Sequence, residues 1–158
     1  MNNNTSNSGG WKSSIMRTKT CGINFSDTGT IIRAIPEELR SALKSVTKYT
    51  DNTGNYGSTA SNITATTDYF FLLSEGEIFG NISRANPNEA SKQAQYAYYS
   101  AGNSKIKYKY DETSTAVYCW LRSPDSQGSN AFVMVTRTGG VTNDVSNFSY
   151  GFAPGFCV

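Results

Sequence analysis

Few residues in this sequence have the types and spacing that catalysis requires. The chain has no histidine, which removes the usual Ser-His-Asp and Cys-His nucleophile systems and histidine-based metal sites. A pair of carboxylates could act as acid and base in glycoside hydrolysis, and Glu75 and Glu77 are the nearest candidates. Ser74 and Glu77, however, have the spacing of a capping box, which predicts that Glu77 binds the start of a helix. The sequence therefore predicts no catalytic residues and no enzymatic activity.

Metal and cofactor sites are not indicated either. The chain contains neither a Gly-rich phosphate-binding loop nor an EF-hand loop. Asn143 and Asp144 could offer oxygen ligands to calcium, but they are too few for a site that needs about six to eight ligands. The three cysteines, Cys21, Cys119 and Cys157, include no C-x-x-C pair. They could form one disulfide and one free thiol, or three thiols, and the apolar surroundings of Cys119 and Cys157 favour buried thiols.

The composition is typical of a surface that binds other molecules. Charged residues make up 16% of the chain, against about 25% in average proteins, so Asn, Ser and Thr supply much of the polarity. Tyr, Ser, Gly and Asn are the residues favoured in paratopes. With 14 basic and 12 acidic residues, the charge is too balanced for a nucleic-acid-binding surface. No apolar run is long enough for a transmembrane helix, and the N-terminal residues lack the pattern of a signal peptide.

One basic stretch, Lys105 to Lys109, has the sequence KIKYK. Lysines alternating with aromatic residues could stack on nucleic-acid bases, but this pattern is more typical of a strand with lysines on its solvent face. We therefore expect no nucleic acid partner, and no insertion into a membrane.

Periodicity, capping and turn signals predict a helical first half and a strand-rich second half. Helices are predicted over residues 35–48, 74–80 and 89–100, with a short one near 13–16. Strands are predicted over residues 68–73, 106–110, 116–122, 131–136, 141–145 and 150–158. Residues 1–10 are predicted to be a flexible lead, residues 50–67 a long loop with a weak hairpin, and residues 11–158 a single domain. This order defines an α+β fold rather than an alternating α/β fold.

Five motifs in a fixed order resemble a known family. They are GGWKSSIMR (Gly9 to Arg17), Val46-Thr47-Lys48, DYFFLLSEGEIFG (Asp68 to Gly80), WLRSP (Trp120 to Pro124) and GFAPGFCV (Gly151 to Val158). Together they resemble a domain of unknown function common in Gram-positive gut bacteria and their phages. That family is similar to C-type-lectin-like domains, including the formylglycine-generating-enzyme-like branch. The resemblance implies two main helices packed on a small twisted antiparallel sheet, with long loops on one face.

The same resemblance implies a function. Some lectin-like relatives are variable proteins of diversity-generating retroelements, which bind molecules on host surfaces. We therefore expect a non-catalytic display or receptor-binding module on a cell surface or a virion, outside the cell, whose partner is a protein or a glycan. The alternatives are a structural decoration domain of a virion or surface layer, with homo-oligomer contacts, and a degenerate member of the enzyme branch. The EPN, QPD and WND motifs of calcium-dependent lectins are absent, and Cys119 and Cys157 do not match the copper site of the enzyme branch.

The C-terminal part of the chain is expected to contain both a rigid frame and a contact surface. The frame is predicted to consist of Trp11, Arg17, Trp120, Arg122, Phe152, Pro154 and Phe156. The ligand-binding candidates are the polar and aromatic residues between the last two motifs, because loops on a rigid scaffold usually carry binding sites. They are Asp125, Ser126, Gln127, Ser129, Asn130, Arg137, Asn143, Asp144, Ser146, Asn147, Phe148 and Tyr150. Arg137, Phe148 and Tyr150 are the expected anchors, since aromatic residues and arginine dominate binding hot spots.

Overall fold

A four-stranded sheet forms the centre of the computed structural model, which describes residues 1–158. Its strands are β5 (Cys119–Pro124), β6 (Ala131–Val135), β7 (Val141–Val145) and β8 (Gly151–Phe152), in the order β7-β6-β5-β8. β5, β6 and β7 are antiparallel neighbours, whereas β8 runs parallel to β5. The prediction of an antiparallel sheet therefore fails at this edge, because the chain crosses the sheet between β7 and β8 instead of turning back as a hairpin.

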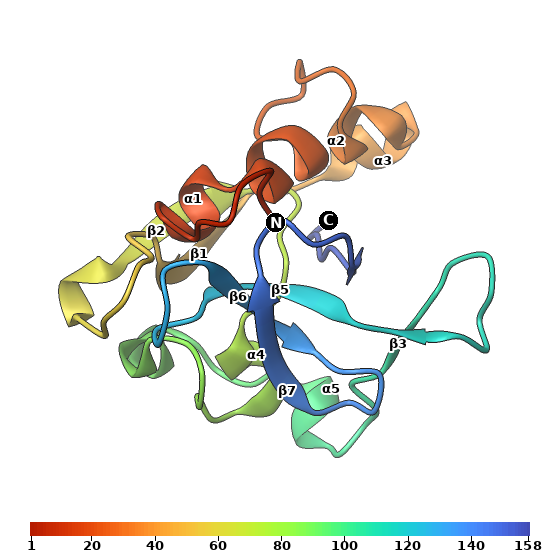
Figure 1. Ribbon diagram of the computed structural model, residues 1–158. Helices are drawn as coiled ribbons and strands as arrows, with labels where there is room; N and C mark the ends of the chain where they lie inside the picture. Colours follow the sequence, from red (N-terminus) through yellow and green to blue (C-terminus); the bar gives the residue numbers. More distant parts are fainter.

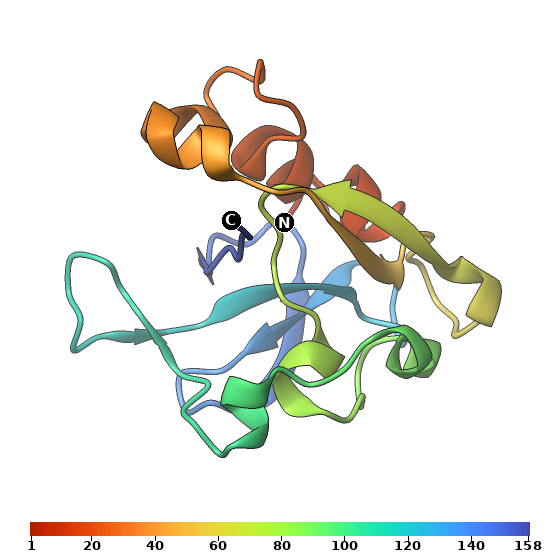
Figure 2. The ribbon, with the colours of Figure 1, turned by 180° about the vertical axis from the view of Figure 1, so that it is seen from behind.

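Short elements cover both faces of this sheet (Figures 1 and 2). On one side lie α1 (Gly10–Ser13), the π-helical turn η1 (Met16–Cys21), α2 (Ile31–Ala34), α3 (Glu37–Ala42) and a hairpin of β1 (Val46–Asp51) and β2 (Ile63–Asp68), which are joined through the turn η2 (Ala60–Asn62). On the other side lie α4 (Glu75–Phe79), the 3-10 turn η3 (Pro87–Lys92) and α5 (Ala97–Ser100). The small hairpin of β3 (Lys107–Tyr108) and β4 (Ala116–Val117) extends away from the body. The fold is thus mixed α+β, as predicted.

Alternating side chains of β5 and β6 build the core on both faces of the sheet. Trp120, Phe132 and Met134 point to the side of α1 and pack with a cluster that includes Trp11. Cys119, Leu121, Val133 and Val135 point to the side of α4 and pack with Ile78 and Tyr99. All residues of β5 and β6 are buried, so these two strands form the rigid scaffold of the molecule.

The expectation of two main helices is wrong, because no α-helix in the structure exceeds six residues. The helix predicted over residues 35–48 ends at Ala42, and residues 46–51 form β1. β1 pairs with β2 over six residues, in a hairpin whose loop includes the predicted turn around residues 55–57. β-branched Val46, Thr47 and Thr50 favour this pairing over a helix. No helix of the structure has the length and apolarity needed to span a membrane.

Three further predicted elements are replaced in part by irregular chain. The helix expected over residues 89–100 is broken into η3 and α5, with residues 93–96 extended between them. Of the strand expected over residues 68–73, Asp68 ends β2, residues 69–70 bend, and Phe71 makes a single bridge to Gly155. Tertiary packing overrides local propensity in both places. The strand expected over residues 150–158 is likewise reduced to β8 and isolated bridges.

The capping box that starts α4 is confirmed. The Ser74 hydroxyl accepts a hydrogen bond from the Glu77 amide, and the Glu77 carboxylate accepts one from the Ser74 amide. Gly80 ends the helix in the left-handed conformation, with φ 79°, as its type predicts. Local side-chain chemistry therefore defines this helix correctly from the sequence alone.

The N-terminal segment is packed against the body, so the prediction of a flexible lead over residues 1–10 is wrong. Met1 is buried in the core cluster of the α1 side, and Asn7 is fully buried. The Asn7 amide donates hydrogen bonds to the backbone oxygens of Asp125, Gly128 and Ala131, at 2.9–3.1 Å. These contacts explain how so polar a segment becomes ordered: buried backbone carbonyls of a distant loop need donors, and Asn7 supplies them.

Buried ion pairs connect the layers. Arg122, which is fully buried, pairs with Glu77 of α4 and donates a hydrogen bond to Thr50 of β1 at 2.7 Å. Lys48 also pairs with Glu77, at 2.9 Å. Burial alone would raise the pKa of Glu77, but the charges of Arg122 and Lys48 outweigh it and lower the pKa to about 2. Glu77 is therefore the anionic centre of a structural network, as its place in the capping box predicts.

A second buried carboxylate anchors the N-terminal layer. Asp68 accepts hydrogen bonds from the Trp11 indole at 3.1 Å, the Arg17 guanidinium at 2.6 Å and the Thr66 hydroxyl at 2.6 Å. Trp11 and Arg17 are both buried. Both side chains therefore connect the N-terminal layer to the end of β2.

Glu89 gives a testable dependence of stability on pH. Its carboxylate is fully buried and accepts hydrogen bonds from the Asp51 amide and the Ser123 hydroxyl. Burial raises its pKa to about 6 from the ordinary value of 4.5. The folded state then binds a proton more tightly than the unfolded state, so this residue's contribution to stability falls as pH rises from about 4.5 to about 6. The expected loss is about 2 kcal/mol.

Urea unfolding at pH 4.5, 5, 6 and 7.5 measures this contribution. Glu77, whose pKa is lowered, acts in the opposite direction, because its stabilisation is lost as the pH falls below its ordinary value. We therefore compare the wild type with Glu89→Gln, in which every other carboxylate is unchanged. The difference between the two should change across this interval. Parallel pH profiles would contradict a raised pKa for Glu89.

Candidate functional site: the aromatic groove

A groove runs between the β3–β4 hairpin and the β5–β8 edge of the central sheet. It has a volume of about 830 Å³. It is lined by Lys107, Tyr108, Lys109, Tyr110, Val117, Tyr118, Cys119, Arg137, Ser149, Tyr150, Gly151, Phe152 and Ala153. Figures 1 and 2 show the β3–β4 hairpin reaching out beside the sheet. We call this groove the aromatic groove.

The floor of the aromatic groove is a cluster of packed rings. The ring centroid of Tyr150 lies 5.5 Å from that of Tyr118, 5.4 Å from that of Trp120 and 6.0 Å from that of Phe148. The Tyr150 hydroxyl donates a hydrogen bond to Asp144 at 2.7 Å, and this bond raises the pKa of the phenol. Because both ends of the ring are held, Tyr150 is a rigid surface of the kind that forms binding hot spots.

Cations border the aromatic groove, and no carboxylate lines it. The Arg137 guanidinium lies over the Tyr118 ring, 5.1 Å from its centroid. The Lys107 ammonium donates a hydrogen bond to the Tyr99 hydroxyl at 3.0 Å. Lys109, in contrast, pairs with Glu112 at 3.3 Å. The groove therefore combines aromatic faces with local positive charge.

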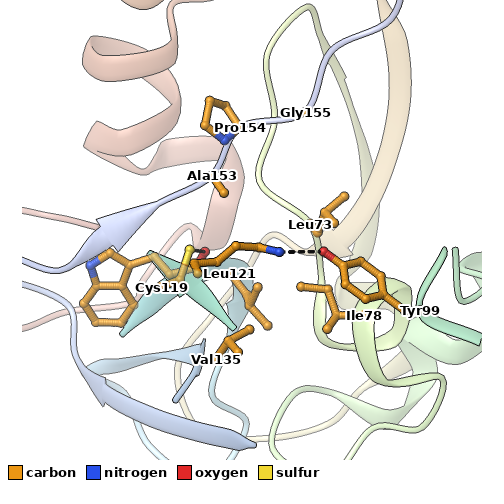
Figure 3. Close-up of a pocket in the computed structure, with 11 residues that line it drawn as sticks. Leu73, Ile78, Tyr99, Cys119, Leu121, Val135, Ala153, Pro154 and Gly155 are labelled. Atoms are coloured by element: carbon orange, nitrogen blue, oxygen red, sulfur yellow. Dashed lines mark hydrogen bonds between the residues drawn. The ribbon is translucent and has the colours of Figure 1, made fainter. Parts of the chain in front are cut away.

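An apolar cavity adjoins the groove on the α4 side of the sheet (Figure 3). Its volume is about 220 Å³, and Lys107, Cys119 and Ala153 line both the cavity and the groove. Figure 3 shows the hydroxyl of Tyr99 pointing into this cavity, where its hydrogen bond with Lys107 lies. Lys107 thus lines both spaces, and its ammonium is bound to a residue of the cavity.

The cysteines are three free thiols, so the alternative of one disulfide is not found. Burial raises the pKa of Cys119 to about 11 and that of Cys21 to about 12. Both thiols are therefore protonated at neutral pH and are weak nucleophiles. No group of three or more histidine, cysteine, aspartate or glutamate side chains is placed to hold a metal ion.

The structure separates the predicted ligand-binding residues into two regions. Arg137 and Tyr150 line the aromatic groove, with Phe148 and Asp144 in contact with Tyr150. Of the twelve candidates, only Arg137 and Tyr150 line the groove. The loop of residues 125–130 lies at the other end of β5, because that strand starts at the groove and ends at the loop.

Two of the predicted contact residues have structural roles instead. Asp125 is buried, and its backbone accepts a hydrogen bond from Asn7. Ser146 is also buried, and its hydroxyl donates to the backbone oxygen of Asn4 at 2.7 Å. Both therefore hold the N-terminal segment. Half-buried Ser126 donates to the backbone oxygen of Arg84. The exposed members of this region are Gln127, Ser129, Asn130 and Asn147.

The predicted frame residues differ in burial. Trp120 and Arg122 are buried. Phe152 and Phe156, however, are 37% and 44% exposed, and Pro154 is only half-buried. β8 is a two-residue edge strand, so few elements are available to cover its side chains. Phe152 is instead a wall of the aromatic groove.

Several groove residues were not predicted as a binding site. Lys107 and Tyr108 belong to the KIKYK stretch, which was interpreted as a strand with a solvent face. Tyr118 precedes the WLRSP motif in the chain. The alternation of lysine and aromatic residues in KIKYK is the one sequence signal for a binding role here. Tyr108 and Tyr110 are exposed, and they line the groove together with Phe152 of β8.

The fold and this groove define a mixed α+β domain with an aromatic, cation-bordered surface site. The whole chain, residues 1–158, matches the family model described as Domain of unknown function (DUF6273), and the chain belongs to that family. No curated protein and no solved structure matches the chain.

Proposed function

We propose that this protein is a non-catalytic binding module that recognises a protein or glycan on a cell surface through the aromatic groove. The observation that carries the proposal is the groove itself: about 830 Å³, with four tyrosines and a phenylalanine among its lining residues. Large apolar surfaces on monomeric proteins usually mark binding sites. Aromatic residues with polar tips suit such sites, because they bury apolar area and still form hydrogen bonds.

In this proposal the domain is displayed on a cell or a virion, and its fold is a C-type-lectin-like variant. The resemblance of the five motifs supports the relationship, together with a small central sheet and long loops. Because β5 and β6 form a rigid scaffold, the residues of the groove could differ among related proteins, and so bind different ligands, while the fold is kept.

A pair of substitutions at exposed groove residues tests the proposal. Tyr108 is 50% and Phe152 is 37% exposed, so Tyr108→Ala/Phe152→Ala should leave the fold intact. Tyr56 and Tyr98, which are 80% and 58% exposed and do not line the groove, provide the matched control Tyr56→Ala/Tyr98→Ala. The wild type and both variants are compared in cell-binding assays and on a glycan array.

We expect the groove variant to lose at least about tenfold in apparent affinity, which corresponds to about 1.4 kcal/mol, and the control variant to bind like the wild type. Equal loss in both variants, or none in the groove variant, would contradict the proposal. A stable oligomer in light scattering that dissociates only in the groove variant would instead support a structural assembly role for the same surface.

A further inference from the structure

The charges around the aromatic groove favour a particular chemical class of ligand. Of the three cations that line it, Lys109 is paired with Glu112, whereas Arg137 and Lys107 take part in none of the ion pairs of the structure. A positively charged group without a counter-ion, placed beside apolar rings, attracts an anion more strongly than one in open solvent. Both cations therefore lack a counter-ion, and Arg137, which is exposed, is open to a negative charge from outside.

Arg137 is oriented by the ring beneath it. Its guanidinium lies over the Tyr118 ring, which favours a fixed position through a cation–π contact. The N–H groups at the edge of a stacked guanidinium stay available, and their planar fork matches the two oxygens of a carboxylate. Arg137 is exposed, so a ligand in the groove can reach this fork without a rearrangement of the core.

The rings of the groove are suited to the apolar faces of sugars. Tyr108 and Phe152 present exposed ring surface, and Tyr150 is held in place from below by Trp120. The C–H face of a pyranose packs on such rings, while tyrosine hydroxyls can donate to or accept from the sugar hydroxyls. A peptide could also cover the rings, but the alternation of aromatic faces and hydroxyls suits a ligand that is apolar on its faces and polar at its rim.

We propose that the aromatic groove binds a saccharide that carries a carboxylate, such as a uronic or sialic acid residue, with the carboxylate at Arg137. Lys107 supplies a second cation that lines the groove, and the sugar rings lie against Tyr108, Tyr150 and Phe152. This inference rests on the proposed function, because it names the ligand class of the same groove.

The small number of unpaired cations in the groove favours a saccharide with isolated carboxylates over a densely charged polymer. Sulfated or phosphorylated chains bind best to continuous basic tracks. The chain has a net charge of only +2, and one of the three groove cations already has a carboxylate 3.3 Å away. Isolated carboxylates along an otherwise neutral saccharide match this arrangement better.

The experiment compares acidic oligosaccharides with neutral counterparts of the same backbone. Sialylated and asialo forms of one oligosaccharide, and uronic acid and hexose oligomers of equal length, are titrated into the full chain by calorimetry. The variants are Arg137→Gln, Lys107→Gln and, as a control of equal charge loss, Arg33→Gln on α2, which is exposed and does not line the groove. Far-ultraviolet circular dichroism checks that each variant is folded.

The wild type should bind at least one acidic form about tenfold more tightly than its neutral counterpart. Arg137→Gln should remove most of this preference, Lys107→Gln should reduce it, and Arg33→Gln should leave it unchanged. Equal binding of acidic and neutral forms would overturn the inference while leaving the proposed function standing. Equal losses in Arg137→Gln and Arg33→Gln, or a preference for sulfated or phosphorylated chains or acidic peptides, would also overturn it.

Discussion

Replacing Arg122 with alanine should lower the free energy of unfolding by about 3–5 kcal/mol, the range measured when one partner of a buried ion pair is removed. Arg122 is fully buried and serves several layers at once. It pairs with Glu77 of α4, donates to the backbone oxygen of Leu72 at 2.8 Å and donates to the Thr50 hydroxyl at 2.7 Å. Alanine would leave all three groups without this partner in the interior, and only Glu77 would retain a second cation, Lys48.

Urea unfolding of the wild type and of Arg122→Ala measures the effect. Arg40→Ala is the control, because the partner of Arg40, Glu37, is 86% exposed and 3.9 Å away, so the substitution leaves no buried carboxylate without a cation. The double variant Arg122→Ala/Glu77→Ala should lose less than the sum of the two single variants, since it leaves no unpaired carboxylate. A loss for Arg122→Ala no larger than that for Arg40→Ala would contradict the structural role assigned to this network.

The elements that the sequence predicts correctly are those defined by local chemistry. Ser74, Glu77 and Gly80 define α4, because their hydrogen bonds and backbone conformation depend only on near neighbours in the chain. β1 is the opposite case. Its residues follow helix-forming ones, and only the six-residue pairing with β2 makes them a strand. Because β2 begins only after a long loop, its pairing with β1 cannot be inferred from the periodicity of residues 46–51.

The candidate site was predictable only in part, for a topological reason. Arg137 and Tyr150 were identified as anchors because of their types, and they line the aromatic groove. Their neighbours Lys107 and Tyr108 come from a different part of the chain, and they meet because β8 lies beside β5 and the β3–β4 hairpin reaches the same edge. Alternation along a strand shows which residues share a face, but it does not show whether that face is covered. Phe152 was therefore assigned to the interior although it lines the groove.

The N-terminal segment is another case in which local sequence does not predict burial, and Asn7 is the residue on which its packing depends. Asn7 is fully buried in a segment whose composition is typical of disorder. Its side-chain oxygen accepts a hydrogen bond from the Asn55 amide at 2.7 Å, and its amide donates to two carbonyls of the loop after β5 and to that of Ala131, the first residue of β6. One side chain thus joins the N-terminal segment, the β1–β2 loop and the β5–β6 loop.

Asn7→Ala should therefore lower the free energy of unfolding by about 3 kcal/mol, since it leaves more than one buried polar group unsatisfied at about 1–3 kcal/mol each. It should also increase hydrogen exchange at the Asn55 and Asp125 amides, because the loops that Asn7 connects would open locally. Asn3→Ala is the control, because Asn3 is exposed in the same segment. Urea unfolding and hydrogen exchange of the two variants distinguish a packed segment from a flexible one. If Asn7→Ala were as stable and as protected as Asn3→Ala, the role assigned to Asn7 in joining these three segments would be contradicted.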